Sequence, residues 1–226
     1  YLICVVLNLK ITETNDGSKT LKIPEWNEHY HSTHGAISEA KHVYIKNGLD
    51  LINSDEISIF EMGFGTGLNT FLTYLHALKN QRTVNYYTIE KEPLSLKLVN
   101  KLGYVDLLGA FSEEHIFNKL HMSSWDILIE ISNHFHLFKI HNTIQEYEFD
   151  TTFDLIFYDA FGFRVQSELW QKDILDKIVK FLNRGGILVT YCARGEVKRI
   201  LKSLGMKVES LTGPPGKREM IRAIRL

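Results

Sequence analysis

The stretch ISIFEMGFGTGLN, from Ile57 to Asn69, decides the fold of this chain. Its first half is mostly apolar, as in a buried strand, and its second half carries glycines at three alternate positions, Gly63, Gly65 and Gly67. Apolar residues at helical spacing follow directly, so the pattern predicts a strand, a tight glycine turn and a helix. Glycine accepts a positive φ and lets a ligand approach the backbone, and the helix N-terminus offers free N–H groups.

The spacing of the glycines narrows the choice of ligand. A dinucleotide site reads G-x-G-x-x-G, whereas this turn reads G-x-G-x-G and is preceded by Glu61. That variant resembles the first motif of the Rossmann-like methyltransferases that bind S-adenosylmethionine. Taken alone, it is equally compatible with a strand, a turn and a helix that bind nothing.

The next predicted strand, Val84–Glu90, ends in a second carboxylate. Glu90 lies about 20 residues beyond the glycine turn, where nucleoside-binding folds place the acid that accepts hydrogen bonds from the ribose hydroxyls. A solvated surface glutamate is the alternative. Together, the glycine turn, the acid at the strand end and their spacing favour a nucleoside ligand.

Length and composition are those of one globular domain with a small extension. The 226 residues are 44% apolar and 23% charged, with a net charge of −1, so a nucleic-acid partner would need a local basic patch. The two cysteines, Cys4 and Cys192, lie far apart and predict a reducing, cytoplasmic setting. No apolar run reaches the length of a membrane span, and the opening Tyr1–Leu7 lacks the pattern of a signal peptide.

Strands and helices alternate along the rest of the chain. We expect helices at 68–78, 167–181 and 196–204, a mostly helical stretch at 105–134, and strands at 135–140, 153–159, 187–192, 207–211 and 219–224. Residues 183–186 are expected to cap the helix before them. The alternation predicts an α/β fold with a mainly parallel seven-stranded sheet and an antiparallel last strand.

Residues 1–50 are predicted to form an N-terminal extension, and residues 51–226 the main domain. Strands at 6–14 and 19–23 flank the turn Asn-Asp-Gly-Ser at 15–18, which predicts a β-hairpin. A helix is expected at 38–48.

The segment Glu28–His42 is unusually rich in histidine, with His29, His31, His34 and His42. We predict no metal site, because the cysteine and carboxylate partners of the usual zinc spacings are absent. Two interpretations remain: a helix with polar caps, or a segment that lies over the mouth of the active site.

A further carboxylate, Asp159, ends the predicted strand at 153–159. A carboxylate at the carboxyl end of a parallel strand, beside the glycine turn, lies in the binding crevice of such folds. The alternative is that Asp159 only caps the turn that follows it.

Five stretches now point together to one family. They read YHSxxGAxxE (30–39), ExGFGTGLN (61–69), DAF (159–161) followed by LW (169–170), RGGxLxTY (184–191) and GPPGKREM (213–220). In combination they resemble the tRNA 5-(aminomethyl)-2-thiouridine methyltransferases, which include the methyltransferase half of the bifunctional MnmC enzyme and stand-alone MnmD-type relatives. The resemblance covers nearly the whole chain. One departure is the loop at 162–170, which lacks the prolines that the family usually carries there.

The resemblance implies a Rossmann-like fold and methyl transfer from S-adenosylmethionine to the primary amine of 5-aminomethyluridine at the wobble position of tRNA. It implies the methyltransferase alone, without the flavin oxidase half, and leaves open a separate flavin-dependent oxidase that acts on the same uridine as a partner. We hypothesise that Asp159 is catalytic: it accepts an N–H from the amine, orients it and helps to take its proton.

The family motifs, the strand-end acid Glu90 and the two residues near the end of the strand at 135–140 suggest the other site residues. Cofactor contacts are expected from Glu61, Gly63, Phe64, Gly65, Thr66, Gly67, Asn69, Glu90, Asn142 and Thr143. Substrate contacts are expected from Tyr30, Ser32, Phe161, Trp170, Lys217 and Arg218. Among these, Phe161 and Trp170 are candidates to stack on a flipped-out uridine. The alternative for both is ordinary packing in the hydrophobic core.

The last part of the chain supplies the basic patch that a tRNA substrate requires. Residues Arg194–Leu226 hold nine lysines and arginines against three acids, a net charge of +6. Phosphate contacts are one interpretation, and a solvated helix and strand face is the other. Lys217 and Arg218, in a loop of glycines and prolines, are the strongest candidates for contacting RNA.

Fold alone does not fix the substrate. A methyltransferase of the same scaffold that acts on a small molecule or a protein is therefore one alternative, with a relative of the polyamine synthases as an example. A cofactor-binding module without catalysis is the other.

Overall fold

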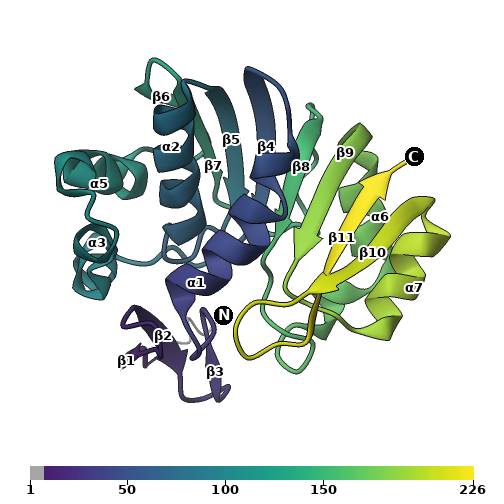
Figure 1. Cartoon of the computed structure of the whole chain (residues 1–226), viewed down its shortest axis with the longest axis horizontal. Coiled ribbons are helices and arrows are strands. Elements are labelled where there is room, and N and C mark those ends of the chain that lie inside the picture. Colours follow the sequence, from purple (N-terminus) through teal and green to yellow (C-terminus); the bar gives the residue numbers. More distant parts are fainter. Residues whose placement is uncertain (1–7) are drawn as a thin grey trace.

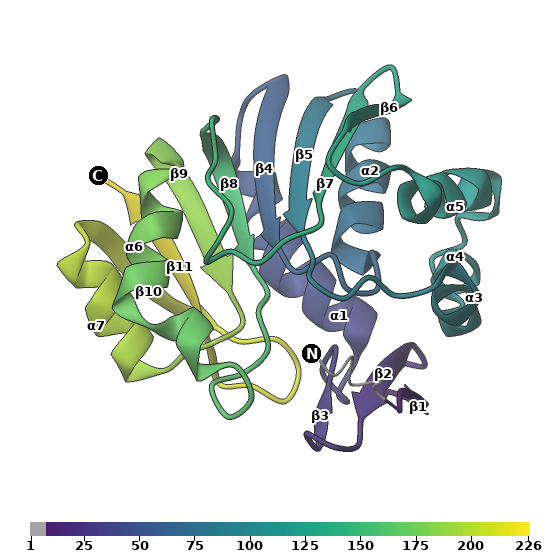
Figure 2. The same cartoon turned by 180° about the vertical axis from the view of Figure 1, so that it is seen from behind.

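The computed structural model describes residues 8–226, which form a twisted sheet with helices on both faces (Figures 1 and 2). Within the described residues this central sheet has eight strands in the order β10-β11-β9-β8-β4-β5-β7-β6. The parallel strands at its centre are β4 (Glu56–Met62), β5 (Thr83–Ile89), β7 (Phe135–Ile140), β8 (Phe153–Tyr158) and β9 (Leu182–Thr190). These strands consist largely of apolar runs, as expected for parallel strands that are buried on both faces of a sheet.

The antiparallel last strand is confirmed. Strand β11 (Glu219–Arg225) runs antiparallel to both of its neighbours, β9 and β10 (Met206–Thr212). The prediction of seven strands is wrong, because β6 (Leu128–Ser132) forms an antiparallel hairpin with β7. A helical stretch was expected there. The strand lies at the sheet edge, where a clear apolar alternation is not needed, and Leu128 remains 51% exposed.

A second correction concerns residues 183–186, which do not cap a helix. They lie inside β9, in an irregularity that separates the pairing of Leu182 with Phe153 from that of Ile187 with Leu155. Gly185 has a φ of 78° there. Extra residues in one strand are accommodated by such a bulge, and glycine supplies the left-handed conformation it needs.

Two layers of helices cover the sheet (Figures 1 and 2). One face packs against α1 (Ala36–Ala40), its π-helical continuation η1 (Lys41–Lys46), α2 (Leu68–Asn80) and α5 (Glu114–Met122). The other face packs against α6 (Lys172–Lys180) and α7 (Gly195–Ser203). Short helices complete the fold: η2 (Leu49–Leu51), α3 (Leu96–Val99), η3 (Asn100–Leu102), α4 (Tyr104–Leu107), η4 (Phe111–Glu113) and η5 (Ser167–Trp170).

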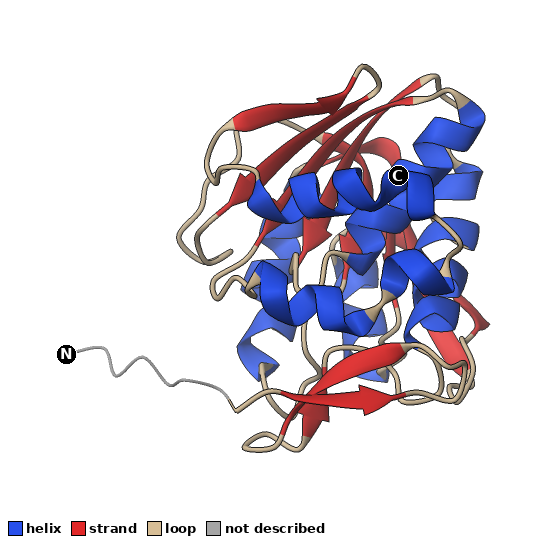
Figure 3. Ribbon diagram, turned by 90° about the vertical axis from the view of Figure 1, so that its left-hand side faces the viewer, coloured by secondary structure: helices blue, strands red, loops and turns tan. Residues whose placement is uncertain are grey.

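The N-terminal extension forms a small sheet of its own at one end of the molecule (Figure 3). Its strands are β1 (Lys10–Glu13), β2 (Lys19–Ile23) and β3 (Glu28–His29). The predicted hairpin is confirmed for its described part. The beginning of its first strand and the segment Tyr1–Leu7 lie outside the described residues. Strand β3 is only two residues long, too short for its sequence pattern to indicate a strand.

The carboxylate of Asp16 fastens the hairpin turn to the following helix. It accepts hydrogen bonds from the N–H of Ser18 at 3.0 Å and from the N–H of Ser38 at 2.9 Å. Burial raises the pKa of Asp16, but its hydrogen bonds outweigh that effect and hold the pKa well below the usual range. Because Ala36 and Val43 share one core with Ile57, the extension packs onto the sheet; the domain boundary at residue 50 stays a prediction.

Between residues 8 and 226, no helix is both long and apolar enough to cross a membrane.

Candidate active site

A cavity of about 670 Å³ lies at the carboxyl ends of β4, β5 and β8. This volume is in the range of small-molecule sites. Segments far apart in the sequence form its wall: the extension at 28–33, the glycine turn, the loop after β7 and the loop after β8. The parallel sheet brings them together because the carboxyl ends of its strands meet at one edge.

The glycine turn follows β4 directly and adopts the conformation that its sequence predicts. Gly63, Gly65 and Gly67 have φ values of 90°, 49° and 71°, a region that other residues rarely adopt. Gly63 and Gly65 line the cavity, and a Cβ at Gly63 would meet only the carbonyl oxygen of Asp159, at 3.7 Å. The space beside Gly63 is therefore open to a ligand, while the N–H groups of Gly63 and Gly65 donate to Ile89 and Glu90.

Gly67 has a different role from the other two glycines. It does not line the cavity but precedes α2, and a Cβ there would lie 2.6 Å from Nε2 of the buried His121. The close packing of the turn on α5 thus explains this glycine. Its predicted contact with the cofactor is not supported by its position.

Glu90 follows β5 and is joined to the glycine turn. Its Oε2 accepts the N–H of Gly65 at 3.0 Å, and its Oε1 accepts the N–H of Glu92 at 2.9 Å. Burial raises the pKa of Glu90, while these backbone hydrogen bonds oppose the rise. The carboxylate is thus held in one orientation at the cavity wall, with lone pairs left for further donors.

Glu61, near the end of β4, also lines the cavity although it is only 1% exposed. Its Oε2 accepts the hydroxyl of Thr70 at 3.0 Å. Burial, together with the negative charge of Asp159, raises the pKa of Glu61 to about 8. A ligand cation in the cavity would reverse this effect by favouring the carboxylate.

Asp159 lies across the cavity from Glu90, after β8. Its Oδ2 accepts a hydrogen bond from Nδ2 of Asn69 at 2.8 Å. Burial raises the pKa of Asp159 to about 7, although Asn69 and the positive charge of Lys217 oppose the rise. The carboxyl group therefore changes its protonation state near neutral pH, as is suitable for a proton acceptor.

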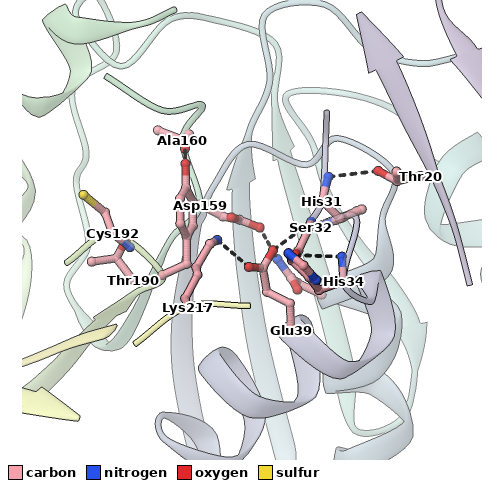
Figure 4. A network of polar contacts seen from close by, with 12 residues as sticks. Thr20, His31, Ser32, His34, Glu39, Asp159, Ala160, Thr190, Cys192 and Lys217 are labelled. Atoms are coloured by element: carbon pink, nitrogen blue, oxygen red, sulfur yellow. Dashed lines mark hydrogen bonds and ion pairs between the residues drawn. The ribbon is translucent and has the colours of Figure 1, made fainter. Parts of the chain in front are cut away.

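An ion pair crosses the cavity beside Asp159 (Figure 4). Nζ of Lys217, from the loop between β10 and β11, lies 2.5 Å from Oε2 of Glu39 in α1. Oε1 of the same glutamate accepts the N–H of Ser32 at 3.1 Å. The Lys217 ammonium also lies 3.9 Å from the ring centroid of Tyr191, a cation–π distance.

Most of the predicted site residues line this one cavity. Those from the cofactor set are Glu61, Gly63, Phe64, Gly65, Thr66, Asn69, Glu90, Asn142 and Thr143. Those from the substrate set are Tyr30, Ser32, Phe161 and Lys217, and Asp159 joins them. The structure fixes where these residues lie; their roles stay predictions.

The prediction that Trp170 stacks on a base is wrong. Trp170 is 1% exposed, does not line the cavity, and donates its indole N–H to the carbonyl oxygen of Phe161 at 2.8 Å. Its ring packs edge-on against Tyr158. Trp170 is therefore a core residue that supports the loop carrying Phe161. Arg218 lies outside the main cavity as well, on a neighbouring groove.

The histidine-rich segment lines the mouth of the cavity with residues 28–33. Its side chains turn to separate partners: Nε2 of His31 lies 2.7 Å from Oγ1 of Thr66, and Nε2 of His42 lies 2.8 Å from the carbonyl oxygen of Thr212. Within residues 8–226, no cluster of three or more potential ligands could hold a metal ion. The interpretation of a segment over the active site agrees with this placement.

Three residues in the cavity wall were quoted in motifs but received no predicted role: Glu39, His31 and Tyr191. The motifs at 30–39 and 184–191 contain all of them, so a signal was present. It could not be interpreted without the structure, because Glu39 meets its partner Lys217 across 178 positions of sequence.

Four of the nine cations in the basic segment at the end of the chain form ion pairs, among them Lys207 with Glu209. Lys198 contacts Glu219, Arg222 contacts Glu209, and Lys217 contacts Glu39. Among the described residues, Arg194, Arg199, Lys202, Arg218 and Arg225 form no ion pair. Glu209 and Glu219 belong to the segment and are already counted in its net charge of +6, so only the pairing of Lys217 with Glu39 lowers the charge that is available to a partner.

Known proteins are similar to this chain over most of its length. Residues 114–225 match a family described as S-adenosyl-L-methionine-dependent methyltransferase. The chain is 31% identical over 215 residues to the tRNA 5-methylaminomethyl-2-thiouridine biosynthesis bifunctional protein MnmC of Leptospira interrogans, a match covering 87% of this chain and 32% of that protein. A protein of the same name from Campylobacter fetus is 27% identical over 220 residues, covering 94% and 35%.

A solved structure shows the same fold. The crystal structure of MNMC2 from Aquifex aeolicus is similar with a TM-score of 0.73 and 24% identity, covering 96% of this chain and 70% of that one. The chain spans about a third of the length of the two bifunctional relatives.

The sheet, the glycine turn and the cavity define the class of the protein as the S-adenosylmethionine-dependent methyltransferases. Within that class, the chain belongs to the family formed by the methyltransferase domains of the MnmC proteins.

The cavity fits the cofactor of this family. The buried Oδ1 of Asn69 has no hydrogen-bond partner within the described part of the chain, although buried polar atoms are normally paired. The same side chain donates a hydrogen bond from Nδ2 to Asp159, whose carbonyl oxygen lies beside Gly63 of the glycine turn. An acceptor of this kind suits the amino group of the methionine part of S-adenosylmethionine.

Proposed function

We propose that the protein transfers a methyl group from S-adenosylmethionine to the primary amine of a 5-aminomethyluridine in tRNA. The observation that carries the proposal is the placement of Asp159: a half-buried carboxyl group whose pKa is about 7 shares one cavity with the glycine turn. The names of the MnmC relatives support the choice of tRNA and of a thiouridine precursor.

Each group in the cavity has a defined task under this proposal. Glu90 accepts hydrogen bonds from the ribose hydroxyls, Asn142 and Thr143 contact the adenine, and Asn69 with Glu61 holds the methionine part. When bound, S-adenosylmethionine supplies an electrophilic methyl group on a sulfonium centre.

Asp159 acts on the acceptor. A substrate amine enters largely as an ammonium ion, and its nitrogen attacks only after it loses a proton. The Asp159 carboxylate accepts an N–H of the amine, directs its lone pair into the cavity and takes the proton that is released. Phe161 and Tyr30, whose rings lie edge-to-face with centroids 5.0 Å apart, form the wall against which the uracil packs.

The partner enzymes follow from the same chemistry. The acceptor must carry a primary amine, so another enzyme has to release that amine. A separate flavin-dependent oxidase acting on the same uridine fits this requirement, and a reducing, cytoplasmic setting suits all of these enzymes.

One experiment tests the proposal directly. The protein is incubated with labelled S-adenosylmethionine and tRNA from cells that cannot complete wobble-uridine modification, and the nucleosides are separated and identified by mass spectrometry. We expect label in a methylaminomethyluridine, formed more slowly by about 100-fold or more with Asp159→Asn. Label in a protein or small molecule instead, or cofactor binding without transfer, would contradict the proposal and favour the alternatives.

A further inference from the structure

A second concave surface adjoins the active-site cavity. This groove, of about 590 Å³, is more open than the cavity and is formed by the loop after β8, the residues 191–194 that join β9 to α7, and the loop between β10 and β11. Gly162, Tyr191 and Lys217 line both the groove and the cavity. The two concavities therefore adjoin along these three residues, so a strand lying in the groove would pass the entrance of the cavity.

The groove is positively charged. Four cationic residues line it, Arg164, Arg194, Lys217 and Arg218, and its one acid is Glu219. That acid is already neutralised, because Nζ of Lys198 lies 2.5 Å from its Oε2. Lys217 and Arg164 contact Glu39 and Glu28, so the charge left for a partner is mainly that of two residues, Arg194 and Arg218.

The Arg194 guanidinium is positioned without an acidic partner in the described residues. Its central carbon lies 4.4 Å from the ring centroid of Phe163, and that ring in turn stacks on Trp170 with centroids 5.7 Å apart. A cation over an aromatic face keeps its N–H donors free. The buried Trp170 thus forms the base of a stack that presents an arginine to the groove.

We propose that this groove binds the phosphodiester backbone of the RNA strand beside the nucleotide that enters the cavity. The inference rests on the proposed function and adds the path of the substrate to it. Arginines suit phosphate because their planar fork of donors matches its oxygens. The groove adjoins the cavity along Gly162, Tyr191 and Lys217, which favours the substrate's own backbone over a separate anion, because the strand on either side of a nucleotide in the cavity has to lie beside it.

The test uses a double variant, Arg194→Gln with Arg218→Gln. The matched control is Arg199→Gln with Lys202→Gln, which removes the same charge from exposed positions outside the groove. Methyl transfer is measured on tRNA and on the free nucleoside 5-aminomethyluridine. In the groove variant we expect the ratio of kcat/KM for tRNA to kcat/KM for the nucleoside to fall about tenfold. The slope of log affinity for tRNA against log salt concentration should also become shallower, by about 0.7 for each lost phosphate contact.

A ratio within twofold of the control variant would overturn the proposal. Binding of a fluorescent anticodon-stem RNA, measured by anisotropy without cofactor, tests the groove separately from the proposed methyl transfer. If wild-type protein methylates neither substrate, the proposed function fails, whereas weaker RNA binding by the groove variant alone would still support the groove. Tighter wild-type binding of a phosphoserine peptide of equal charge than of the RNA would overturn the assignment to RNA.

Discussion

The ammonium group of Lys217 lies 2.5 Å from the carboxylate of Glu39, so a loop near the end of the chain is joined to a helix near its beginning across the active-site cavity. The Glu39 side chain is 8% exposed and that of Lys217 is 33% exposed. Both charges lie close enough to Asp159 to affect its pKa in opposite directions. The pair therefore ties the N-terminal extension to the catalytic region.

Breaking this pair from one side is expected to destabilise the fold. Lys217→Met leaves the Glu39 carboxylate buried without its cation, which we expect to lower the free energy of unfolding by about 2 kcal/mol, less than for a fully buried pair because Lys217 is partly exposed. Urea denaturation measures the change. The double variant Glu39→Gln with Lys217→Met should recover part of the loss, and strictly additive losses would show that the two residues are not coupled.

Methyl transfer should depend on pH through Asp159. The carboxylate is the form that accepts a proton, and burial raises the pKa of Asp159 to about 7. The single-turnover rate at saturating cofactor and substrate is thus expected to rise with pH to a midpoint near 7. Asp159→Asn should be slower by about 100-fold or more and should lose this midpoint. An unchanged profile in the variant would assign the proton transfer to another group.

The protonation of Asp159 should also affect the free energy of unfolding, which is expected to fall as pH rises, whereas the rate of methyl transfer is expected to increase. The folded pKa of Asp159, about 7, lies above its ordinary value of 3.8. Its contribution to stability is therefore fully present below about pH 4 and is lost as pH rises through 7. The difference in unfolding free energy between Asp159→Asn and wild type, from urea denaturation at several pH values without cofactor, should grow in favour of the variant from pH 5 to 8. A constant difference would contradict the raised pKa.

Glu90 is expected to set cofactor affinity. Glu90→Gln keeps the size of the side chain but weakens hydrogen bonds from the ribose hydroxyls, since bonds to a charged acceptor are stronger. We expect S-adenosylhomocysteine to bind about tenfold more weakly, a loss of about 1.4 kcal/mol, as measured by calorimetry. Glu92→Gln, which changes an exposed neighbouring acid, is the control. Equal affinities for the two variants would remove Glu90 from the cofactor site.

Two glycines with similar backbone conformations separate strain from close packing. Gly67 and Gly103 have φ values of 71° and 68°, so alanine costs each about 1–2 kcal/mol of strain. A Cβ at Gly67 would also lie 2.6 Å from the His121 ring, whereas nothing lies within 4 Å of one at Gly103. Thermal unfolding should show Gly67→Ala to be clearly the more destabilised variant. Equal melting temperatures would mean that His121 moves aside freely.

The sequence by itself determined the parallel core and the acids at its strand ends. Periodicity and turn chemistry are local properties, and they located the glycine turn, Glu61, Glu90 and Asp159 without reference to distant residues. Once the strands were known to be parallel, their carboxyl ends had to meet at one edge, so that these groups were expected to share one site.

Only the tertiary structure decided which residues far apart in the sequence pack, pair or form ion pairs with one another. Trp170 could stack on a base or fill the core, because the same aromatic surface suits both, and packing against Tyr158 decided for the core. The edge strand β6 exists through its pairing with β7 and not through a pattern of its own. The contact of Glu39 with Lys217 joins residues 178 positions apart, and no local rule can predict such a pair, because it depends on how the whole chain folds around the sheet.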